Sequence, residues 1–143
     1  MSDGGKATVK TLLEKDLLSP EDVEELRKLV YCSEKHRKVA DKFLSEMEAD
    51  PSAKRNRNKA FKLSLLYWFA GRDREAIDLL EKHLSSPLDY ATFAAWCLTK
   101  DMYEEAADKA KEGLKKYKDD FDLKCLYAHA VIKLGNLEEG QNI

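Results

Sequence analysis

The residues best suited to chemistry are two cysteine–histidine pairs, Cys32 with His36 and Cys125 with His129. Both pairs are spaced i, i+4, so a helix would place each thiol beside its imidazole on one face. Each pair could then supply half of a zinc site. Nothing in the sequence suggests that the two pairs meet. We therefore interpret them as ordinary helix-face residues and predict no metal site.

Recognisable catalytic motifs are absent from the sequence. The chain contains no glycine-rich phosphate loop, no Cys-x-x-Cys, no His-Glu-x-x-His and no serine nucleophile motif. His83 lies on the apolar side of an amphipathic pattern, which favours a partly buried structural histidine. The acidic pairs Glu104-Glu105 and Glu138-Glu139 fall on helix faces that we expect to be solvated. We predict a protein that is not an enzyme and has no cofactor.

The strongest charge feature is a basic run formed by Lys54, Arg55, Arg57 and Lys59. Such a run can bind nucleic acid or act as a nuclear localisation signal, but it also occurs as a solvated first turn of a helix. No aromatic residues are interleaved with it on the same face. The net charge of −2 gives no long-range attraction to nucleic acid or to anionic membranes. Nucleic acid is therefore the less favoured partner.

The composition predicts an all-helical protein of one domain's length. Among 143 residues, 43% are hydrophobic and 36% are charged, and only 6 Gly and 3 Pro are present, which argues against a turn-rich β architecture. The three cysteines are odd in number and widely spaced, so a reducing compartment is favoured. The N-terminus does not resemble a signal peptide, and the apolar run 63–70 is too short to span a bilayer. We predict a cytoplasmic protein.

Signals for the start of a helix recur along the chain. The first helices of four pairs are predicted to begin at Ser19-Pro20, Asp50-Pro51, Ser86-Pro87 and Asp119-Asp120-Phe121. These starts fall at 20, 51, 87 and about 121, so they are separated by 31, 36 and 34 residues. Second starts are predicted at Ser33, Gly71-Arg72-Asp73, Asp101-Met102-Tyr103-Glu104 and Asn136-Leu137-Glu138-Glu139, of which the last two have the pattern of capping boxes. Helix pairs with a period near 34 residues are typical of a solenoid.

Within these pairs, Gly71-Arg72-Asp73-Arg74-Glu75-Ala76-Ile77 resembles the middle of a tetratricopeptide repeat. Leu134-Gly135-Asn136-Leu137-Glu138-Glu139 resembles it again, and so does Asp101-Met102-Tyr103-Glu104-Glu105-Ala106 without the glycine. The family's small packing positions correspond to Ala40, Ala76, Ala106 and Gly140 on second helices and to Ser64, Ala94 and Ala128 on first helices. Four residues after the small position of each second helix, the family carries a large apolar or aromatic residue. Leu44 and Leu80 match it, and Ala110 does not. The resemblance covers residues 57–140 and implies a right-handed α-solenoid of antiparallel helix pairs; a generic helical bundle is the alternative.

The sequence predicts three parts of the chain. Residues 1–5 are expected to form a disordered tail, residues 6–56 to form N-terminal helices that include a degenerate pair, and residues 57–143 to form the repeats. An amphipathic helix over residues 6–18 carries Val9, Leu12, Leu13 and Leu17. The last repeat is incomplete, because the chain stops a turn into its second helix. We interpret the chain as a fragment of a longer array, the alternative being that another molecule covers this end.

The family resemblance also implies a binding surface, because the first helices of tetratricopeptide pairs line a concave groove. The matching residues here are Phe61, Lys62, Leu65, Trp68, Ala91, Thr92, Ala95, Leu98, Cys125, Leu126 and His129. The basic carboxylate clamp of chaperone-binding members is absent, since Phe61, Leu65, Thr92, Asp122 and Leu126 stand at the corresponding positions. An apolar groove suits an amphipathic helix. Phe61, Leu65 and Leu126 could instead be core residues, and the helix over residues 6–18 could cover the groove.

These observations predict a non-catalytic protein–protein interaction module whose groove binds a hydrophobic peptide or an amphipathic helix. The alternative function is a self-assembling structural scaffold, in which the incomplete C-terminal repeat stacks on another copy or on further repeats. No membrane partner is expected.

Overall fold

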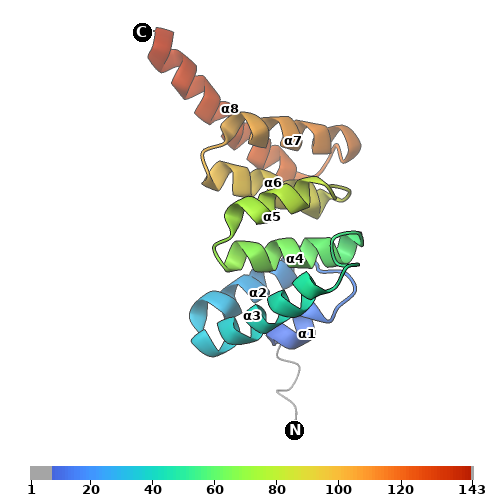
Figure 1. The fold of residues 1–143 in the computed structure, drawn as a ribbon. Coiled ribbons are helices and arrows are strands. Elements are labelled where there is room, and N and C mark those ends of the chain that lie inside the picture. The colour runs from blue at the N-terminus through green and yellow to red at the C-terminus, as the bar shows by residue number, and fades with distance from the viewer. Residues whose placement is uncertain (1–7, 143) are drawn as a thin grey trace. The chain divides into compact units, whose positions relative to one another are not determined.

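The computed structural model describes residues 8–142, with the side chains of residues 8–135 (Figure 1). This part of the chain contains no strand and forms eight helices. They are α1 (Val9–Leu13), α2 (Pro20–Cys32), α3 (Glu34–Ala49), α4 (Arg57–Phe69), α5 (Asp73–Glu81), α6 (Pro87–Thr99), α7 (Tyr103–Lys116) and α8 (Phe121–Asn142). The predicted all-helical fold is confirmed. The tail predicted for residues 1–5 lies outside the described residues.

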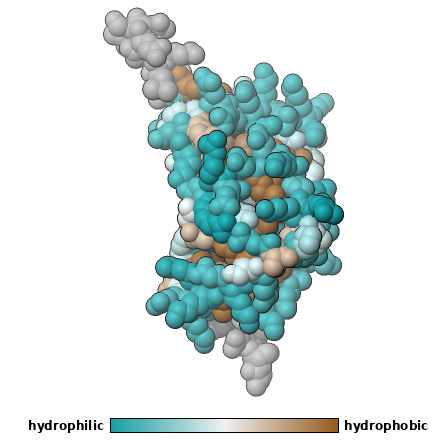
Figure 2. Space-filling model, viewed as in Figure 1, coloured by the Kyte–Doolittle hydropathy of each residue, from teal (hydrophilic) through white to brown (hydrophobic). Residues whose placement is uncertain are grey.

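The helices belong to two compact units, Met1–Leu80 and Glu81–Ile143. The first unit contains α1 to α4 and nearly all of α5, and the second contains α6 to α8. On the face shown in Figure 2, hydrophilic residues predominate and apolar residues are visible between them. This surface agrees with a composition in which 36% of the residues are charged.

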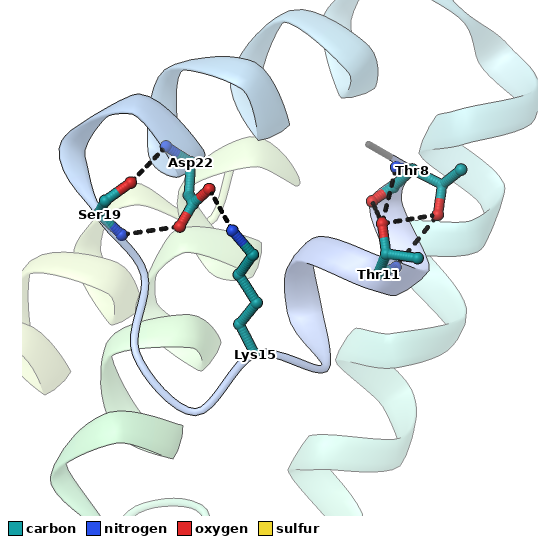
Figure 3. Close-up of polar contacts among 5 residues, drawn as sticks. All are labelled: Thr8, Thr11, Lys15, Ser19 and Asp22. Atoms are coloured by element: carbon teal, nitrogen blue, oxygen red, sulfur yellow. Dashed lines mark hydrogen bonds and ion pairs between the residues drawn. The ribbon is translucent and has the colours of Figure 1, made fainter. Parts of the chain in front are cut away.

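Reciprocal capping boxes begin α1 and α2 (Figure 3). The Thr8 hydroxyl accepts a hydrogen bond from the Thr11 backbone N–H at 3.1 Å, and the Thr11 hydroxyl accepts one from the Thr8 N–H at 2.8 Å. At α2, the Ser19 hydroxyl accepts from the Asp22 N–H at 3.1 Å, and the Asp22 carboxylate accepts from the Ser19 N–H at 2.9 Å. Both boxes satisfy N–H groups that a helix start leaves without a partner.

The N-terminal helix is shorter than predicted. It begins at Val9 and ends at Leu13, whereas the apolar spacing predicted a helix over residues 6–18. Leu17, expected on the same apolar stripe, is 66% exposed in the loop that follows. That loop is held by an ion pair of 2.8 Å between Lys15 and Asp22 (Figure 3). Lys15 therefore binds the first turn of α2, and α1 does not extend through this residue.

In the first unit, α1 packs on α2 and α3, and both of these helices pack on α4. All side chains of α4 from Ala60 to Tyr67 are buried. The other helices contribute to this core with Val9, Leu12, Leu13, Leu26, Val30, Ala40 and Leu44. A helix that is apolar on more than one side can be stable in water only where neighbours cover it.

Several of the predicted helix starts are confirmed. The break at Ser33 separates α2 from α3. Ser86 caps α6 in a capping box with Asp89, and the Asp120 carboxylate accepts from the Leu123 N–H at 2.9 Å in the first turn of α8. Gly71 has a φ of +82° in the turn before α5. That left-handed conformation carries no steric penalty for glycine.

The start predicted at Asp50-Pro51 is wrong. The Asp50 carboxylate accepts hydrogen bonds from the backbone N–H and the hydroxyl of Ser52, both at 2.9 Å. This side-chain turn competes with helix formation, and the chain forms turns over residues 51–55. The helix α4 begins only at Arg57, where Asn56 accepts from the Lys59 N–H at 3.1 Å.

In the C-terminal half, the helix start predicted at Asp101-Met102-Tyr103-Glu104 is confirmed, but its capping box is not, and the start predicted at Asn136 is wrong. Asp101 has a φ of 60° in the turn after α6, and α7 begins at Tyr103 behind Met102, which makes no side-chain cap. At Asn136 the chain does not turn, because α8 continues unbroken from Phe121 to Asn142. Gly135 therefore lies inside a helix, and the predicted fourth helix pair is one long helix.

In the second unit, α6, α7 and α8 all pack against one another. The buried side of α7 consists of the small residues Ala106, Ala107, Ala110 and Gly113. A Cβ atom at Gly113 would lie 3.0 Å from the Cβ of Tyr90 on α6 and 3.0 Å from a methyl group of Leu123 on α8. The absence of a side chain at this position therefore permits the close approach of the three helices.

We expect Gly113→Ala to lower the free energy of unfolding by about 1 kcal/mol or more, because overpacking outweighs the ~1 kcal/mol that alanine gains over glycine in a helix. Gly135→Ala is the matched control, since a Cβ there meets nothing within 4 Å. That change should raise stability by up to about 1 kcal/mol. Urea denaturation measures both values. A Gly113→Ala protein more stable than the parent would contradict the packing described.

Candidate interaction surface

The predicted groove residues of the first unit lie mostly in its core. The exposed fractions of Phe61, Lys62 and Leu65 are 7%, 9% and 1%. Trp68 is half-buried. Phe61 and Leu65 therefore occupy the position that the core interpretation assigned to them. Phe61, Lys62 and Leu65 therefore offer almost no surface to a partner.

Lys62 shows how the N-terminal segment reaches α4. Its ammonium group donates a hydrogen bond to the backbone carbonyl of Lys15, in the loop that follows α1. Burial lowers the pKa of Lys62, and the neighbouring Lys59 lowers it further. The segment expected to cover the groove does contact α4, but through this loop. The apolar residues of α1 are buried in a helix that packs on α2 and α3.

A polar network joins the ends of α3 and α4 to the start of α5. The Tyr67 hydroxyl donates to the Glu48 carboxylate at 3.0 Å, and the Arg72 guanidinium donates two hydrogen bonds to the same carboxylate at 3.1 and 2.9 Å. Arg72 also pairs with Glu75 at 2.7 Å and lies 4.5 Å from the centre of the Tyr67 ring. Burial, followed by the hydrogen bond to Glu48 and then by the charge of that carboxylate, raises the pKa of Tyr67 to about 12. Every charged group in this network has a partner, which indicates a structural role.

We expect Glu48 to make the protein's stability depend on pH in the acidic range. Hydrogen bonds from Arg72, and then from Tyr67, hold the pKa of this carboxyl below its ordinary value. Its stabilising contribution is therefore present above the unfolded pKa of about 4.3 and is lost as the pH falls through the lower folded pKa. Glu48→Gln should reduce the difference in unfolding free energy between neutral and strongly acidic pH by up to about 1 kcal/mol, since the group is partly exposed.

Glu46→Gln, on an exposed position of the same helix, is the matched control. Urea denaturation of the parent and both variants over a range of pH measures the effect. An equal pH dependence in the two variants would contradict a special role for Glu48.

The predicted basic patch is exposed but interspersed with acids. Lys54, Arg55, Arg57 and Lys59 all lie on the surface, in the turns before α4 and in its first turn. Lys59 forms an ion pair of 3.4 Å with Asp50 and donates to the Ser52 hydroxyl at 3.0 Å. The pKa of Glu48 and of Glu75 is lowered mainly by hydrogen bonds from Arg72 and, to a smaller extent, by the charge of Lys54. These nearby carboxylates weaken the field that the patch would offer to a phosphate backbone.

The predicted groove residues of the second unit are more accessible. Ala91, Thr92, Ala95 and Leu98 lie half-buried on α6, where their spacing places them along one side of the helix. On α8, Leu126 is half-buried, and Cys125 and His129 are exposed. Since α6 packs against α8, these two sets belong to neighbouring helices of one unit. This part of the predicted groove can be reached by a partner.

The most exposed apolar residues of α8 were not among the predicted site residues. Phe121, Val131 and Ile132 have exposed fractions of 74%, 43% and 59%. On the other side of the same helix, Leu123 and Ala130 are fully buried. The sequence did contain a signal for this surface, because a helix from Phe121 to Leu134 has apolar residues on every side. If neighbours pack on only one side of such a helix, the apolar residues of another side stay uncovered.

The cysteines and histidines of the described residues belong to no group of three or more side chains that could hold a metal ion. Cys32 ends α2, whereas His36 lies on α3 with its Nδ1 3.2 Å from the Leu29 carbonyl oxygen. Cys125 and His129 share α8 and are exposed. Cys97 is fully buried, and this burial raises the pKa of its thiol to about 12.

Two surface hollows lie away from the predicted groove residues. One, of about 280 Å³, is lined by Asp101, Met102, Tyr103, Glu104, Glu105 and Leu134. The other, of about 440 Å³, is lined by Pro20, Glu21, Glu24, Glu25 and Lys28. Both are open and rich in carboxylates, unlike the enclosed, mainly apolar pockets that bind small molecules.

The chain matches no model of a protein family, no curated protein and no solved structure with which it was compared. None of the helices in residues 8–142 combines the length and the apolar character needed to cross a bilayer.

Proposed function

We propose that the protein is a non-catalytic protein–protein interaction module that binds a hydrophobic peptide or an amphipathic helix. The observation that carries this proposal is the exposure of Phe121 and Ile132, 74% and 59%, on a helix whose opposite side carries the fully buried Leu123 and Ala130. Single exposed apolar residues are common on protein surfaces. Several on one face of one helix mark a surface that a partner covers.

The proposed binding surface also includes the accessible groove residues of α6 and α8. Ala91, Ala95 and Leu98 offer a partly apolar row on α6, and Cys125 and His129 lie on the neighbouring α8. A partner helix with apolar residues at i, i+3, i+4 and i+7 would suit such a surface. The proposed binding surface excludes Phe61 and Leu65, because both are buried in the first unit.

We further propose that the helix pairs form a right-handed, tetratricopeptide-like solenoid. Burial of the small residues at the family's packing positions supports this: Ala40 is 4% exposed, and Ser64, Ala76, Ala94 and Ala106 are fully buried. Ala128 departs from the pattern because it is exposed on α8, which no returning helix follows within the described residues. The free thiols of Cys32, Cys97 and Cys125 support placing the module in the cytoplasm.

A titration with a designed amphipathic peptide tests the proposed function. The probe is a 14-residue helical peptide with leucine at i, i+3, i+4 and i+7, and a scrambled peptide of equal composition is its control. We expect the first peptide to shift the amide resonances of Thr92, Ala95, Cys125 and His129 more than those on the exposed side of α7. Thr92→Glu should weaken these shifts, because it places an unpaired charge at the apolar surface.

Lys111→Glu is the control variant, since Lys111 is exposed on α7. Thermal melts establish that both variants fold. Equal shifts with both peptides, or none with the designed peptide, would contradict the proposed function.

A further inference from the structure

The exposed apolar residues of α8 follow a coiled-coil spacing. Phe121, Cys125, Ala128 and Ile132 are separated by steps of four, three and four, as alternating d and a positions of a heptad are. All four are exposed, and together they form what we call the α8 stripe. The buried residues Leu123 and Ala130 both fall at the f position, on the opposite side of the helix. The stripe is therefore a continuous apolar seam that faces outward.

We propose that a second copy of this chain covers the α8 stripe, with the two α8 helices packed antiparallel about a two-fold axis. The inference rests on the proposed function, because it names the partner of the interaction module. In this arrangement Phe121 packs against Ile132 of the second copy, and Cys125 packs against Ala128 of the second copy. Large residues thus meet large ones at both ends of the seam, and small residues meet in the middle, where they allow close approach.

The charges that flank the stripe favour this orientation. Asp122 and His129 occupy e positions, and Lys124 and Val131 occupy g positions. In an antiparallel pair, Asp122 lies beside His129 of the second copy, where the carboxylate accepts a hydrogen bond from the imidazole N–H. Lys124 lies beside the uncharged Val131 of the second copy. A parallel pair would instead place Lys124 beside His129, and it would align the two helix dipoles.

The α8 stripe is complementary to itself, and for this reason we propose a second copy as the partner in preference to a different protein. A two-fold interface uses the same patch twice, so each residue of the stripe must find its complement within the stripe itself. The two apolar pairs and the Asp122–His129 pair meet this condition without leaving a charge against the apolar seam. With a rise of 1.5 Å per residue, the stripe is only about 16 Å long. The expected dimer is therefore weak, in the range of small transient interfaces.

Sedimentation velocity of the full chain tests the dimer at concentrations up to roughly 1 mM, where a weak interface is populated. We expect a monomer–dimer equilibrium whose Kd rises at least roughly tenfold in Ile132→Glu, since the dimer would bury an unpaired carboxylate. Lys133→Glu is the matched control, because it places the same residue one position away and off the stripe. It should leave the Kd within about threefold of the parent value.

A charge exchange tests the orientation independently. Asp122→Lys alone should weaken the dimer, because it places an ammonium group beside His129 of the second copy. Adding His129→Asp to the same chain places a carboxylate beside the new ammonium group and should recover most of the affinity. Failure of the second change to restore the dimer would overturn the antiparallel register.

Disulfide cross-linking gives a second test of the register, in proteins that also carry Cys32→Ser and retain the buried Cys97. One protein keeps Cys125, and the other exchanges the pair through Cys125→Ala and Ala128→Cys. Because the two positions face each other, mild oxidation of the mixture should yield the mixed dimer faster than either protein alone yields its own. Faster cross-linking of Cys125 to itself would overturn the antiparallel arrangement.

A parent chain that stays monomeric, or an Ile132→Glu protein that dimerises as well as the parent, would overturn the self-pairing. The designed-peptide titration remains a separate measurement in either case. A monomer that still binds this peptide through α6 and α8 would keep the interaction module and lose only the second copy as its partner.

Discussion

The burial of α4 is the constraint on which the first unit depends. Its side chains from Ala60 to Tyr67 are all buried, so polar groups among them need partners inside the protein. The Ser64 hydroxyl donates to the Ala60 carbonyl at 2.8 Å, Lys62 donates to the Lys15 carbonyl, and Tyr67 donates to Glu48. The last two bonds reach the loop after α1 and the end of α3. The hydrogen bonds that the buried polar groups of α4 require therefore connect segments that are distant in the sequence.

The second unit depends on the small residues that form the buried side of α7. Its middle helix, α7, packs through three alanines and Gly113, so α6 and α8 both approach it closely. Tyr90 and Leu123 occupy the space that a side chain at Gly113 would need. This close packing uses only one side of α8. Phe121, Val131 and Ile132 of that helix stay at the surface.

The contrast between α4 and α8 bears most directly on function. Both helices carry apolar residues on more than one side, and in each case the hydrophobic effect favours cover on every such side. Helix α4 packs on α2 and α3, and its residues Phe61 and Leu65 are buried and thus removed from the surface open to a partner. Helix α8 does not receive such cover on all sides. Its exposed α8 stripe therefore places the proposed binding surface in the C-terminal part of the chain.

Local signals in the sequence determined most helix boundaries, since a cap at Ser19, Ser86 or Asp120 and a positive φ at Gly71 depend only on nearby residues. They failed at Asp50, where a side-chain turn competed with a helix cap. The helix patterns and the family resemblance likewise placed Phe61 and Leu65 on one helix and Cys125 and Leu126 on another. Which of these faces is covered depends on the packing of neighbouring helices, because periodicity shows which residues share a face and contains no information about what lies against it. Only the tertiary structure decided that α4 is core and that α8 keeps an exposed stripe.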